Sequence, residues 1–257
     1  MPGPPHFLYA LYERQLSKGL DRTRLPHHIG IVLDGHRRYA REEGLPSYTD
    51  SYRAGMARFE EFLTWTNDLG IPVITGWVLS RENLSRPDEE LTPFFEVLME
   101  LFERLPKLAA HHDLRLRFIG SLDLLPAELV ESAKAAEAAC SEGDRHLNIA
   151  MGYGGRQEIV DAAKDLVSRL AMEGVKPEEM AAHIDANSLA RHMYSADVPD
   201  PDLLIRTSGE SRLSGFLLWQ SAYAEFVFVD VYWPAFRRVD FLRALRDYTR
   251  RNRRFGR

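Results

Sequence analysis

The sequence predicts a single α/β domain built on a mostly parallel sheet of about six strands, flanked by helices. Short apolar runs alternate with longer amphipathic stretches, which is the pattern of consecutive βα units. No Ser-, Gly- or Pro-rich linker, internal repeat or low-complexity tract divides the chain. A length of 257 residues with 45% hydrophobic residues is enough for one large domain with its own core.

Each element is expected where the local pattern changes. Short runs of β-branched and other apolar residues predict strands at 29–33, 73–79, 114–119, 147–151, 203–205 and 226–229. Amphipathic stretches predict helices at 5–18, 38–43, 52–68, 88–108, 127–141, 157–172 and 239–251, with shorter ones around 177–183 and 188–193. Ligands of open parallel sheets bind beyond the carboxyl ends of the strands. Polar motifs follow four of the predicted strands, so we expect them to share one site.

The segment 1–25 is predicted to be an accessory helix ahead of a domain at 26–257. Its apolar side chains are Phe7, Leu8, Leu11, Tyr12, Leu16 and Leu20. Their spacing is only weakly amphipathic and allows two interpretations. Either the helix packs on the domain, which we favour, or it lies against a membrane surface.

The composition favours the cytoplasm. The single cysteine, Cys140, excludes an internal disulfide and offers no zinc cluster, as expected in a reducing compartment. No apolar run approaches the roughly 18 residues needed to span a bilayer. The N-terminus lacks the charged-then-apolar order of a signal peptide. We therefore expect a cytoplasmic protein, and peripheral contact with a membrane stays open.

The net charge of −5 is unevenly distributed. The stretch 237–257 carries nine arginines against two aspartates, a net charge of +7, which leaves −12 on the rest of the chain. A basic helix end can meet nucleic acid or anionic lipid, or it can be a solvated helix face. We favour the solvated face and expect no nucleic-acid partner, because the rest of the chain is acidic.

The first polar motif, residues 34–39, follows the predicted strand 29–33 and reads Asp-Gly-His-Arg-Arg-Tyr. It places arginines in the opening turn of a helix, where unpaired N–H groups and the helix dipole favour an anion. Arg38 adds a charge-assisted partner for phosphate oxygens. Asp34 cannot favour an anion, so it indicates a divalent cation such as Mg²⁺ that bridges carboxylate and phosphate. Alternatively Asp34 only caps the helix, and the residues alone leave both interpretations open.

Two further motifs follow predicted strands. Residues 80–87 read Ser-Arg-Glu-Asn-Leu-Ser-Arg-Pro, and residues 152–159 read Gly-Tyr-Gly-Gly-Arg-Gln-Glu-Ile. The first can be a plain polar turn closed by Pro87. The glycines of the second either let a ligand approach the backbone or simply form a turn. Neither motif matches a dinucleotide-binding or P-loop fingerprint.

The most informative motif is the stretch 202–220. An apolar strand leads into a loop with two arginines, Arg206 and Arg212, and several serines and glycines. Guanidinium groups, hydroxyls and backbone N–H groups on one small patch suit a phosphate or diphosphate. Arginines also occur on ordinary surfaces, so the composition of the loop alone does not decide.

Together the four motifs resemble the signatures of the cis-prenyltransferases, the family of undecaprenyl diphosphate synthase and the short-chain Z,E-farnesyl diphosphate synthases. The match extends in order from Asp34 to Gly256 and looks most like the actinobacterial short-chain members. The family's first signature reads Asp-Gly-Asn-x-Arg-Trp-Ala, so His36 stands in place of asparagine and Tyr39 in place of tryptophan. A nucleotide- or phosphosugar-binding α/β protein is a rival interpretation, but its fingerprints are absent from the sequence.

The resemblance implies a role for each matching residue. Asp34 and Glu225 would hold Mg²⁺, and Asp34, His36 and Asn83 would be the catalytic residues. The two substrates would be bound by Gly35, Arg37, Arg38, Tyr39, Ser80, Arg86, Arg206, Arg212, Ser214 and Gly256. His36 could hydrogen-bond as asparagine does, take part in proton transfer or change the activity, and these options stay open. The C-terminal Arg-Phe-Gly at 254–256 and Glu225 imply a homodimer.

The implied reaction condenses isopentenyl diphosphate with an allylic diphosphate and creates a cis double bond. The product would occupy an apolar tunnel between the strand 73–79 and the helix 91–105, walled by Phe94, Phe95, Val97, Leu98, Leu101 and Phe102; alternatively these are ordinary core residues, which we favour for most of them. By family analogy Val78 stands where long-chain members carry alanine. Val78 and the two adjacent phenylalanines suggest an early stop, so we expect a short product, (2Z,6E)-farnesyl diphosphate from geranyl diphosphate. The alternatives are a medium- or long-chain polyprenyl diphosphate synthase and a non-catalytic partner subunit of a prenyltransferase.

Overall fold

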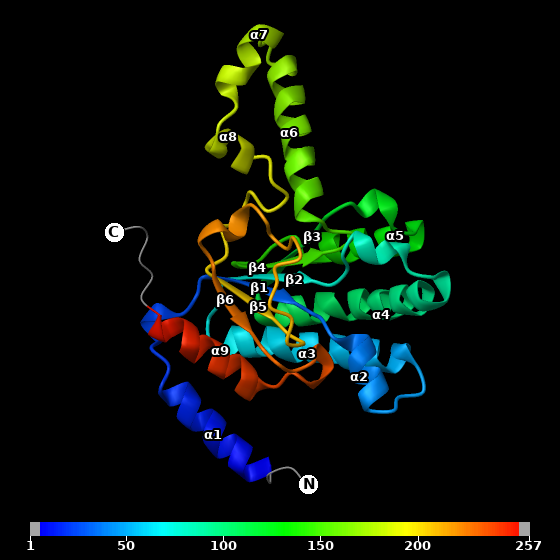
Figure 1. Ribbon diagram of the computed structural model, residues 1–257, viewed down its shortest axis with the longest axis vertical. Helices are drawn as coiled ribbons and strands as arrows, with labels where there is room; N and C mark the ends of the chain where they lie inside the picture. The colour runs from blue at the N-terminus through cyan, green and yellow to red at the C-terminus, as the bar shows by residue number, and fades with distance from the viewer. Residues whose placement is uncertain (1–5, 252–257) are drawn as a thin grey trace.

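The fold is described from a computed structural model, which places residues 6–251. Its centre is a six-stranded parallel sheet with the strand order β3-β4-β2-β1-β5-β6 (Figure 1). The strands are β1 His28–Val32, β2 Val73–Trp77, β3 Leu114–Ile119, β4 Arg145–Ala150, β5 Leu203–Arg206 and β6 Glu225–Phe228. Each predicted strand is present, and the predicted α/β fold is confirmed.

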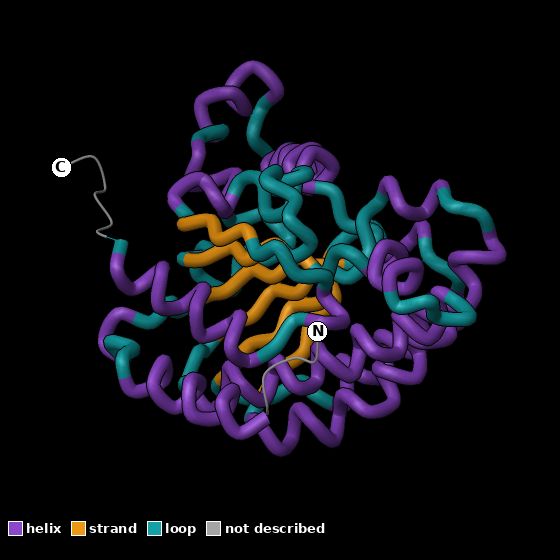
Figure 2. The backbone as a smooth tube through the Cα atoms, turned by 60° about the horizontal axis from the view of Figure 1, so that its bottom comes forward, coloured by secondary structure: helices purple, strands orange, loops and turns teal. Residues whose placement is uncertain are grey.

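Helices cover the sheet and occupy the predicted stretches. They are α1 His6–Lys18, α2 His36–Glu42, α3 Tyr48–Asp68, α4 Asp88–His112, α5 Ala127–Ala139, α6 Gly155–Met172, α7 Pro177–Met180, α8 Ala186–Ala190 and α9 Arg238–Arg250. The helices α3, α4 and α9 lie along one face of the sheet (Figure 1), and the backbone tube shows helices below the strands (Figure 2). Between β4 and β5 the chain makes an excursion through α6, α7 and α8 that projects from the sheet (Figure 1).

The core forms on both faces of the sheet because successive side chains of a strand point to opposite sides. Ile29 and Ile31 of β1 belong to the core under α3, α4 and α9, and Val32 belongs to the core on the other face. That second core is completed by the segments after β4 and β5. Phe216, from the loop after β5, stacks on Trp77 of β2 with 5.1 Å between ring centroids. The loop after β5 is therefore anchored to the sheet.

The N-terminal helix α1 packs along α9 (Figure 1). Leu16 and Leu20 are buried, and the guanidinium of Arg243 lies 5.2 Å from the ring centroid of Tyr12. The division of the chain at residue 25 stays a prediction. Between residues 6 and 251, no helix combines the length and apolar character that crossing a bilayer requires.

His28 is a buried polar residue in β1, at the centre of the sheet. Its Nδ1 lies 2.6 Å from the carbonyl oxygen of Pro199, which can only accept, so Nδ1 carries the proton. Its Nε2 then accepts a hydrogen bond from the hydroxyl of Thr75 at 2.8 Å. Burial lowers the pKa of His28 to about 4, so the folded protein keeps this ring neutral well below pH 6.5.

We expect the free energy of unfolding to fall as the pH drops from about 6.5 to about 4, because only the unfolded chain protonates His28 in this window. The contribution of His28 to the loss between pH 7 and pH 5 is about 2 kcal/mol. Urea unfolding at the two pH values measures it. Between these two pH values, His28→Asn should lose less stability than the wild type, and the difference should equal the contribution of His28. His183 is exposed, so His183→Asn should behave as the wild type. The same loss in His28→Asn and wild type would contradict the prediction.

Candidate active site

The carboxyl ends of β1, β2 and β5 open into one cavity of about 780 Å³. The segments that follow these strands line it, as expected for an open parallel sheet. One part of the lining carries arginines and carboxylates, and another is apolar, with Leu33, Trp77, Leu79 and Phe94. The predicted site residues that line the cavity are Asp34, Gly35, His36, Arg37, Arg38, Ser80, Asn83, Arg86, Arg206, Arg212 and Ser214.

Asp34 lies in the polar part of the cavity, directly after β1. Its Oδ1 accepts the N–H of Gly35 at 2.7 Å, and its Oδ2 accepts Nη2 of Arg206 at 2.9 Å. Nη2 of Arg38 lies 4.0 Å from Oδ1. The N-cap of α2 is Gly35, with no side-chain bond, so Asp34 is not the helix cap. Its side chain is 34% exposed, which leaves the carboxylate accessible to a ligand.

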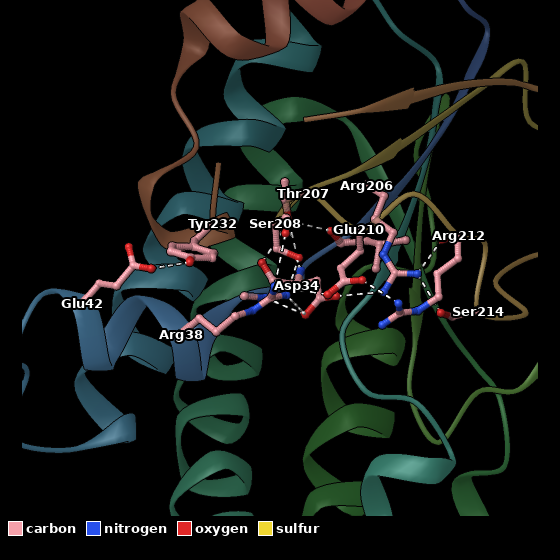
Figure 3. A network of polar contacts seen from close by, with 12 residues as sticks. Asp34, Arg38, Glu42, Arg206, Thr207, Ser208, Glu210, Arg212, Ser214 and Tyr232 are labelled. Atoms are coloured by element: carbon pink, nitrogen blue, oxygen red, sulfur yellow. Dashed lines mark hydrogen bonds and ion pairs between the residues drawn. The ribbon is translucent and has the colours of Figure 1, made fainter. Parts of the chain in front are cut away.

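Arg206 connects this carboxylate to the loop after β5. Its Nη1 donates to the carbonyl oxygen of Arg212 at 2.5 Å and to the hydroxyl of Ser214 at 2.7 Å. Only 9% of its side chain is exposed. The guanidinium is therefore held in one orientation at the end of β5, beside the carboxylate that follows β1 (Figure 3).

Glu210 is a residue of the site that the sequence analysis missed. Its Oε1 lies 3.1 Å from Nη1 of Arg38, and its Oε2 lies 2.6 Å from Nη1 of Arg212. The carboxylate thus bridges an arginine of α2 and an arginine of the loop after β5 (Figure 3). The signal available in the sequence is the place of Glu210 between Arg206 and Arg212.

The loop after β5 contains three non-glycine residues in the left-handed region, Ser208 (φ 74°), Ser214 (φ 51°) and Leu217 (φ 44°). Each costs on the order of 1 kcal/mol. Two of them bring hydroxyls to arginines of the site: Ser208 accepts from Arg38 at 2.8 Å, and Ser214 accepts from Arg206. Strain concentrated at side chains that bind the site's arginines is typical of a functional loop.

Gly35 turns the chain from β1 into α2 with a φ of 105°, a conformation that glycine favours. A Cβ here would lie 2.7 Å from the ring of Tyr232. That ring also lies 5.5 Å from the guanidinium of Arg38, and its hydroxyl donates to Glu42 at 2.5 Å. The turn starts α2 at His36, two residues before the predicted start, and it orients Arg38 toward the cavity.

A second carboxylate, Glu90 of α4, pairs with two other arginines of the site. Its Oε1 accepts Nη1 of Arg86 at 3.0 Å, and its Oε2 lies 3.5 Å from Nη1 of Arg37. The hydroxyl of Tyr52 also donates to Oε1, at 3.2 Å. The side chain of Glu90 is 13% exposed, so this carboxylate is largely withdrawn from solvent, whereas the side chain of Arg37 is 46% exposed.

His36 and Asn83 are each positioned by a local hydrogen bond. The N–H of Asn83 donates to the hydroxyl of Ser80 at 3.1 Å, which begins the helical turn Glu82–Ser85. Nδ1 of His36 lies 3.2 Å from the carbonyl oxygen of Ser51, so it donates and leaves Nε2 as the acceptor. Burial lowers the pKa of His36 to about 4, and the ring is neutral at pH 7.

The cavity carries an excess of positive charge. Six arginines line it, against the carboxylates of Asp34, Glu82 and Glu210. A net charge of this sign in a partly enclosed space suits a ligand with several negative charges. The adjoining apolar lining suits a hydrocarbon group on the same ligand.

Three predicted site residues are not brought to this cavity. Tyr39 follows Arg38 on α2 but does not line the cavity, because its position on the helix turns it away from Arg38. Glu225 begins β6 and is level with Ile29, at the amino end of the sheet, roughly 16 Å along the strands from Asp34. It accepts Nη1 of Arg251 at 2.8 Å. Gly256 lies outside the described residues. Asp34 and Glu225 therefore do not form a metal site within one chain.

The glycine motif at 152–155 serves packing. The N–H of Gly155 donates to the carbonyl oxygen of Gly215 at 3.1 Å, and a Cβ on Gly155 would lie 2.3 Å from that oxygen. None of the four residues lines the cavity. Of the two interpretations, the turn is therefore the one that the structure supports.

The apolar part of the cavity is shorter than the predicted tunnel. Val78 and Phe94 line it, as expected. The other predicted wall residues do not line it: Phe95, Val97, Leu98, Leu101 and Phe102. All of these except Phe95 are at most 1% exposed. Of the two interpretations, the structure supports ordinary core packing for these residues, because α3 packs on α4 there.

The donor set fits a metal ion that arrives together with a phosphate ligand. Among residues 6–251, no group of three or more His, Cys, Asp or Glu side chains could hold a metal ion. Mg²⁺ is usually bound through one or two carboxylates together with substrate phosphates and water. Asp34 offers one such carboxylate, which is partly exposed in the cavity. Arg38 and Arg206, whose guanidinium groups suit phosphate, flank it.

The fold and the site define an α/β protein whose cavity is suited to a phosphorylated compound with an apolar chain. A family model described as putative undecaprenyl diphosphate synthase matches residues 32–256. The (2Z,6E)-farnesyl diphosphate synthase of Thermobifida fusca is 49% identical over 250 residues, with 97% of each chain covered. The tritrans,polycis-undecaprenyl-diphosphate synthase (geranylgeranyl-diphosphate specific) of Methanopyrus kandleri is 46% identical over 253 residues, with 97% of this chain and 92% of the relative covered.

A solved structure gives the same result. The crystal structure of lavandulyl diphosphate synthase from Lavandula x intermedia, in complex with dimethylallyl diphosphate, matches with a TM-score of 0.85 and 30% identity. The match covers 91% of this chain and 100% of that one. The chain therefore belongs to the undecaprenyl diphosphate synthase family, the cis-prenyltransferases, and it is a prenyltransferase, as its motifs predict.

The contacts of Glu210 predict that it competes with a bound diphosphate for Arg38 and Arg212. Glu210→Gln removes the competing charge and keeps the size of the side chain. Inorganic pyrophosphate should then bind about three- to tenfold more tightly, because a partly screened repulsion is removed. Isothermal titration calorimetry without divalent ions measures the dissociation constant.

Glu82→Gln is the matched control for this prediction. It also removes one negative charge from the lining of the cavity, but among residues 6–251 no ion pair involves Glu82. It should change the dissociation constant much less than Glu210→Gln. Weaker binding of pyrophosphate by Glu210→Gln would mean that Glu210 mainly holds the arginines in place, and it would contradict the prediction.

Proposed function

We propose that the chain condenses isopentenyl diphosphate with an allylic diphosphate, geranyl diphosphate, and that it releases (2Z,6E)-farnesyl diphosphate. One observation carries the proposal: a single cavity is lined by arginines around Asp34 and by apolar side chains, Phe94 among them. The arginines suit diphosphates, and an apolar lining within a cavity of about 780 Å³ suits a short product. The name of the Thermobifida fusca relative supports the same product.

The allylic diphosphate is proposed to bind to the first turn of α2. Arg37 and Arg38 both line the cavity there, and Gly35 lets the chain pass close to the ligand. Because α2 has seven residues, the guanidinium groups rather than a helix dipole would supply most of the attraction. Arg86 would contribute from the other side of Glu90.

Isopentenyl diphosphate is proposed to bind to the loop after β5. Arg206 and Arg212 present guanidinium groups to the cavity, and Ser214 adds a hydroxyl. Fixed in this way, the double bond of the donor would face the allylic carbon, which is an effect of orientation. Ser80 and Asn83, which line the cavity after β2, would fix the position of the reacting carbons.

In the proposed reaction, the allylic C–O bond breaks and its electron pair leaves with pyrophosphate. The terminal carbon of the isopentenyl double bond forms the new C–C bond with the allylic carbon. The CH₂ group attached to the other carbon of that double bond then loses a proton, which gives the cis double bond. Arg37 and Arg38 would stabilise the charge that develops on the leaving group. Asp34 would hold Mg²⁺, which, when bound, neutralises charge on diphosphate oxygens. We propose that the released pyrophosphate accepts this proton and that His36 has the role of a positioning contact.

A longer product is the second candidate. The Methanopyrus kandleri relative, with a similar identity to this chain, is named for an undecaprenyl product. Family membership therefore leaves the chain length open, and product sizing separates the two candidates. The presence of Asp34 in an arginine-lined cavity argues against a non-catalytic partner subunit.

Incubation with Mg²⁺, radiolabelled isopentenyl diphosphate and geranyl diphosphate should give a single fifteen-carbon Z,E product, measured by chromatography after dephosphorylation. Asp34→Asn should lower turnover by about 10³-fold or more, because it removes the charge that holds Mg²⁺ and Arg206. Asp144→Asn, exposed ahead of β4 at the opposite end of the sheet, should keep wild-type turnover. A ladder of long products would favour the second candidate, and no extension of geranyl or E,E-farnesyl diphosphate would refute the proposal.

We further propose that the enzyme is a homodimer in which Glu225 joins the Asp34 site of the partner copy. Within one chain the two residues lie at opposite ends of the sheet. Strand β6, which begins with Glu225, is an edge strand of the sheet. Exposed apolar side chains lie on it and just before it, Phe228 at 41% and Tyr223 at 77% exposure, as expected of a surface that a second copy covers.

Mixing two inactive variants tests this arrangement. Asp34→Asn and Glu225→Gln chains, each inactive alone, should regain about a quarter of wild-type activity after mixing and exchange of subunits. Half of the dimers would then be mixed, and each mixed dimer would contain one intact site. Complete lack of recovery in mixtures that are dimeric by light scattering would rule out a shared site.

We also propose that the enzyme acts in the cytoplasm and makes peripheral contact with a membrane. An apolar product gives such an enzyme a reason to approach a bilayer. Exposed arginines of α9, Arg243 at 47% among them, would face anionic lipids. Vesicle flotation with anionic and neutral lipids tests the contact.

A further inference from the structure

Tyr232, in the segment between β6 and α9, lies along one face of α2 (Figure 3). Its ring packs on Gly35 at the start of the helix, where an added Cβ would lie 2.7 Å from the ring. The guanidinium carbon of Arg38, about one turn further on, lies over the ring, 5.5 Å from its centroid. The hydroxyl donates to Oε1 of Glu42, at the last residue of α2, at 2.5 Å. Residues three or four positions apart share a face of a helix, so this one side chain follows the whole length of α2.

The backbone next to Tyr232 is fixed independently of Arg38. The N–H of Trp233 donates to the carbonyl oxygen of Asp34 at 2.9 Å, which ties the segment to the turn before α2. The side chain of Trp233 is fully buried, and its indole N–H donates to the carbonyl oxygen of Gly55, in α3, at 2.8 Å. The place of the Tyr232 ring is therefore set by the fold and not by the arginine that it contacts.

The polar partners of Arg38 occupy N–H groups that a phosphate ligand needs. Its Nη1 lies 3.1 Å from Oε1 of Glu210, and its Nη2 donates to the hydroxyl of Ser208 at 2.8 Å. The same Nη2 lies 4.0 Å from Oδ1 of Asp34. A phosphate that binds the guanidinium through two N–H groups has to replace some of these acceptors. Tyr232 differs from them, because an aromatic ring holds a guanidinium through its π face and takes up no N–H group in a hydrogen bond to an acceptor.

This difference matters because Arg38 is accessible to solvent. Its side chain is 41% exposed, and a long side chain loses rotamer freedom when it binds a ligand. A contact that persists while phosphate replaces Glu210 reduces that loss, since the guanidinium is already oriented. The contact with Tyr232 is of this kind.

We propose that Tyr232 is a positioning residue of the allylic diphosphate site, whose ring keeps Arg38 oriented while the diphosphate replaces the carboxylate of Glu210. The inference rests on the proposed function, in which Arg38 binds the allylic diphosphate, and it adds to that site a residue that does not line the cavity. The donor site should not depend on Tyr232. Arg206 is held there by the carbonyl oxygen of Arg212 and by a serine hydroxyl of the loop after β5.

Isothermal titration calorimetry with Mg²⁺ tests the two sites in turn. The first ligand is geranyl thiolodiphosphate, an allylic analogue that resists reaction because sulfur replaces the oxygen of the bond that breaks. Isopentenyl diphosphate is then titrated into protein saturated with this analogue.

Tyr232→Leu keeps an apolar side chain on Gly35 but removes the ring. It should weaken binding of the analogue about three- to tenfold, the cost of ordering one long side chain. The dissociation constant for isopentenyl diphosphate should change by less than about twofold, as expected for an independent site. Tyr232→Phe keeps the ring and loses only the hydrogen bond to Glu42, so it should stay within about twofold of the wild type for both ligands.

A double-mutant cycle separates an effect through Arg38 from a general effect on the structure. Once Arg38→Ala has removed the guanidinium, adding Tyr232→Leu should not weaken binding of the analogue further. Tyr12→Leu is the matched control, because it removes a ring from the guanidinium of Arg243, between α1 and α9. It should leave both dissociation constants unchanged. Thermal unfolding by circular dichroism shows that each variant is folded.

The outcomes separate this inference from the proposed function. A folded Tyr232→Leu variant that binds the analogue as the wild type does would overturn the inference. Equal weakening with and without the Arg38 guanidinium, or equal weakening of both ligands, would overturn it as well. A wild type that binds both ligands but releases no Z-prenyl product would overturn the function, and the titrations would still decide the role of Tyr232. A wild type that binds no analogue would overturn both.

Discussion

The ion pair between Asp34 and Arg206 is the contact on which the cavity depends. The two residues are 172 positions apart, but they end up at the carboxyl ends of the neighbouring strands β1 and β5. Arg206 is almost withdrawn from solvent, and a buried charge is unfavourable unless it is paired, so the bonds of its two Nη atoms matter the more because its buried Nε has no partner among the described residues. The loop after β5 therefore wraps its own carbonyl oxygen and the Ser214 hydroxyl around the guanidinium, and the left-handed backbone at Ser214 is part of that wrapping.

The same balance of charges extends through the site. Asp34, Glu90 and Glu210 each lie within 4.0 Å of two arginine side chains. Arginines gathered so closely would repel one another, and these carboxylates lower that repulsion. In the proposed function, a diphosphate would exchange places with a carboxylate instead of entering a site of unbalanced charge. Glu90 also accepts a hydrogen bond from the hydroxyl of Tyr52, which connects this network to the apolar part of the cavity.

Much of this arrangement could be predicted, and the failures have physical causes. The side chains after β1, β2 and β5 were expected to meet because parallel strands end at one edge. Within one chain Glu225 lies at the opposite end of the sheet from Asp34, which its motif could not indicate, because a motif does not state at which end of a strand its residue will lie. The apolar face of α4 allowed two interpretations, a tunnel wall and ordinary core, because periodicity shows that a face is buried but not whether a helix or a ligand covers it.

The sequence by itself determined the fold class, the six strands, the helices around them and the family, because hydrophobic periodicity and motif order are properties of the chain read in order. Only the tertiary structure decided that Glu210 bridges Arg38 and Arg212 and that Tyr52 meets Phe94. These contacts join residues from separate elements, and their geometry depends on how α2, α3, α4 and the loop after β5 pack on the sheet. No local pattern in the chain encodes that packing.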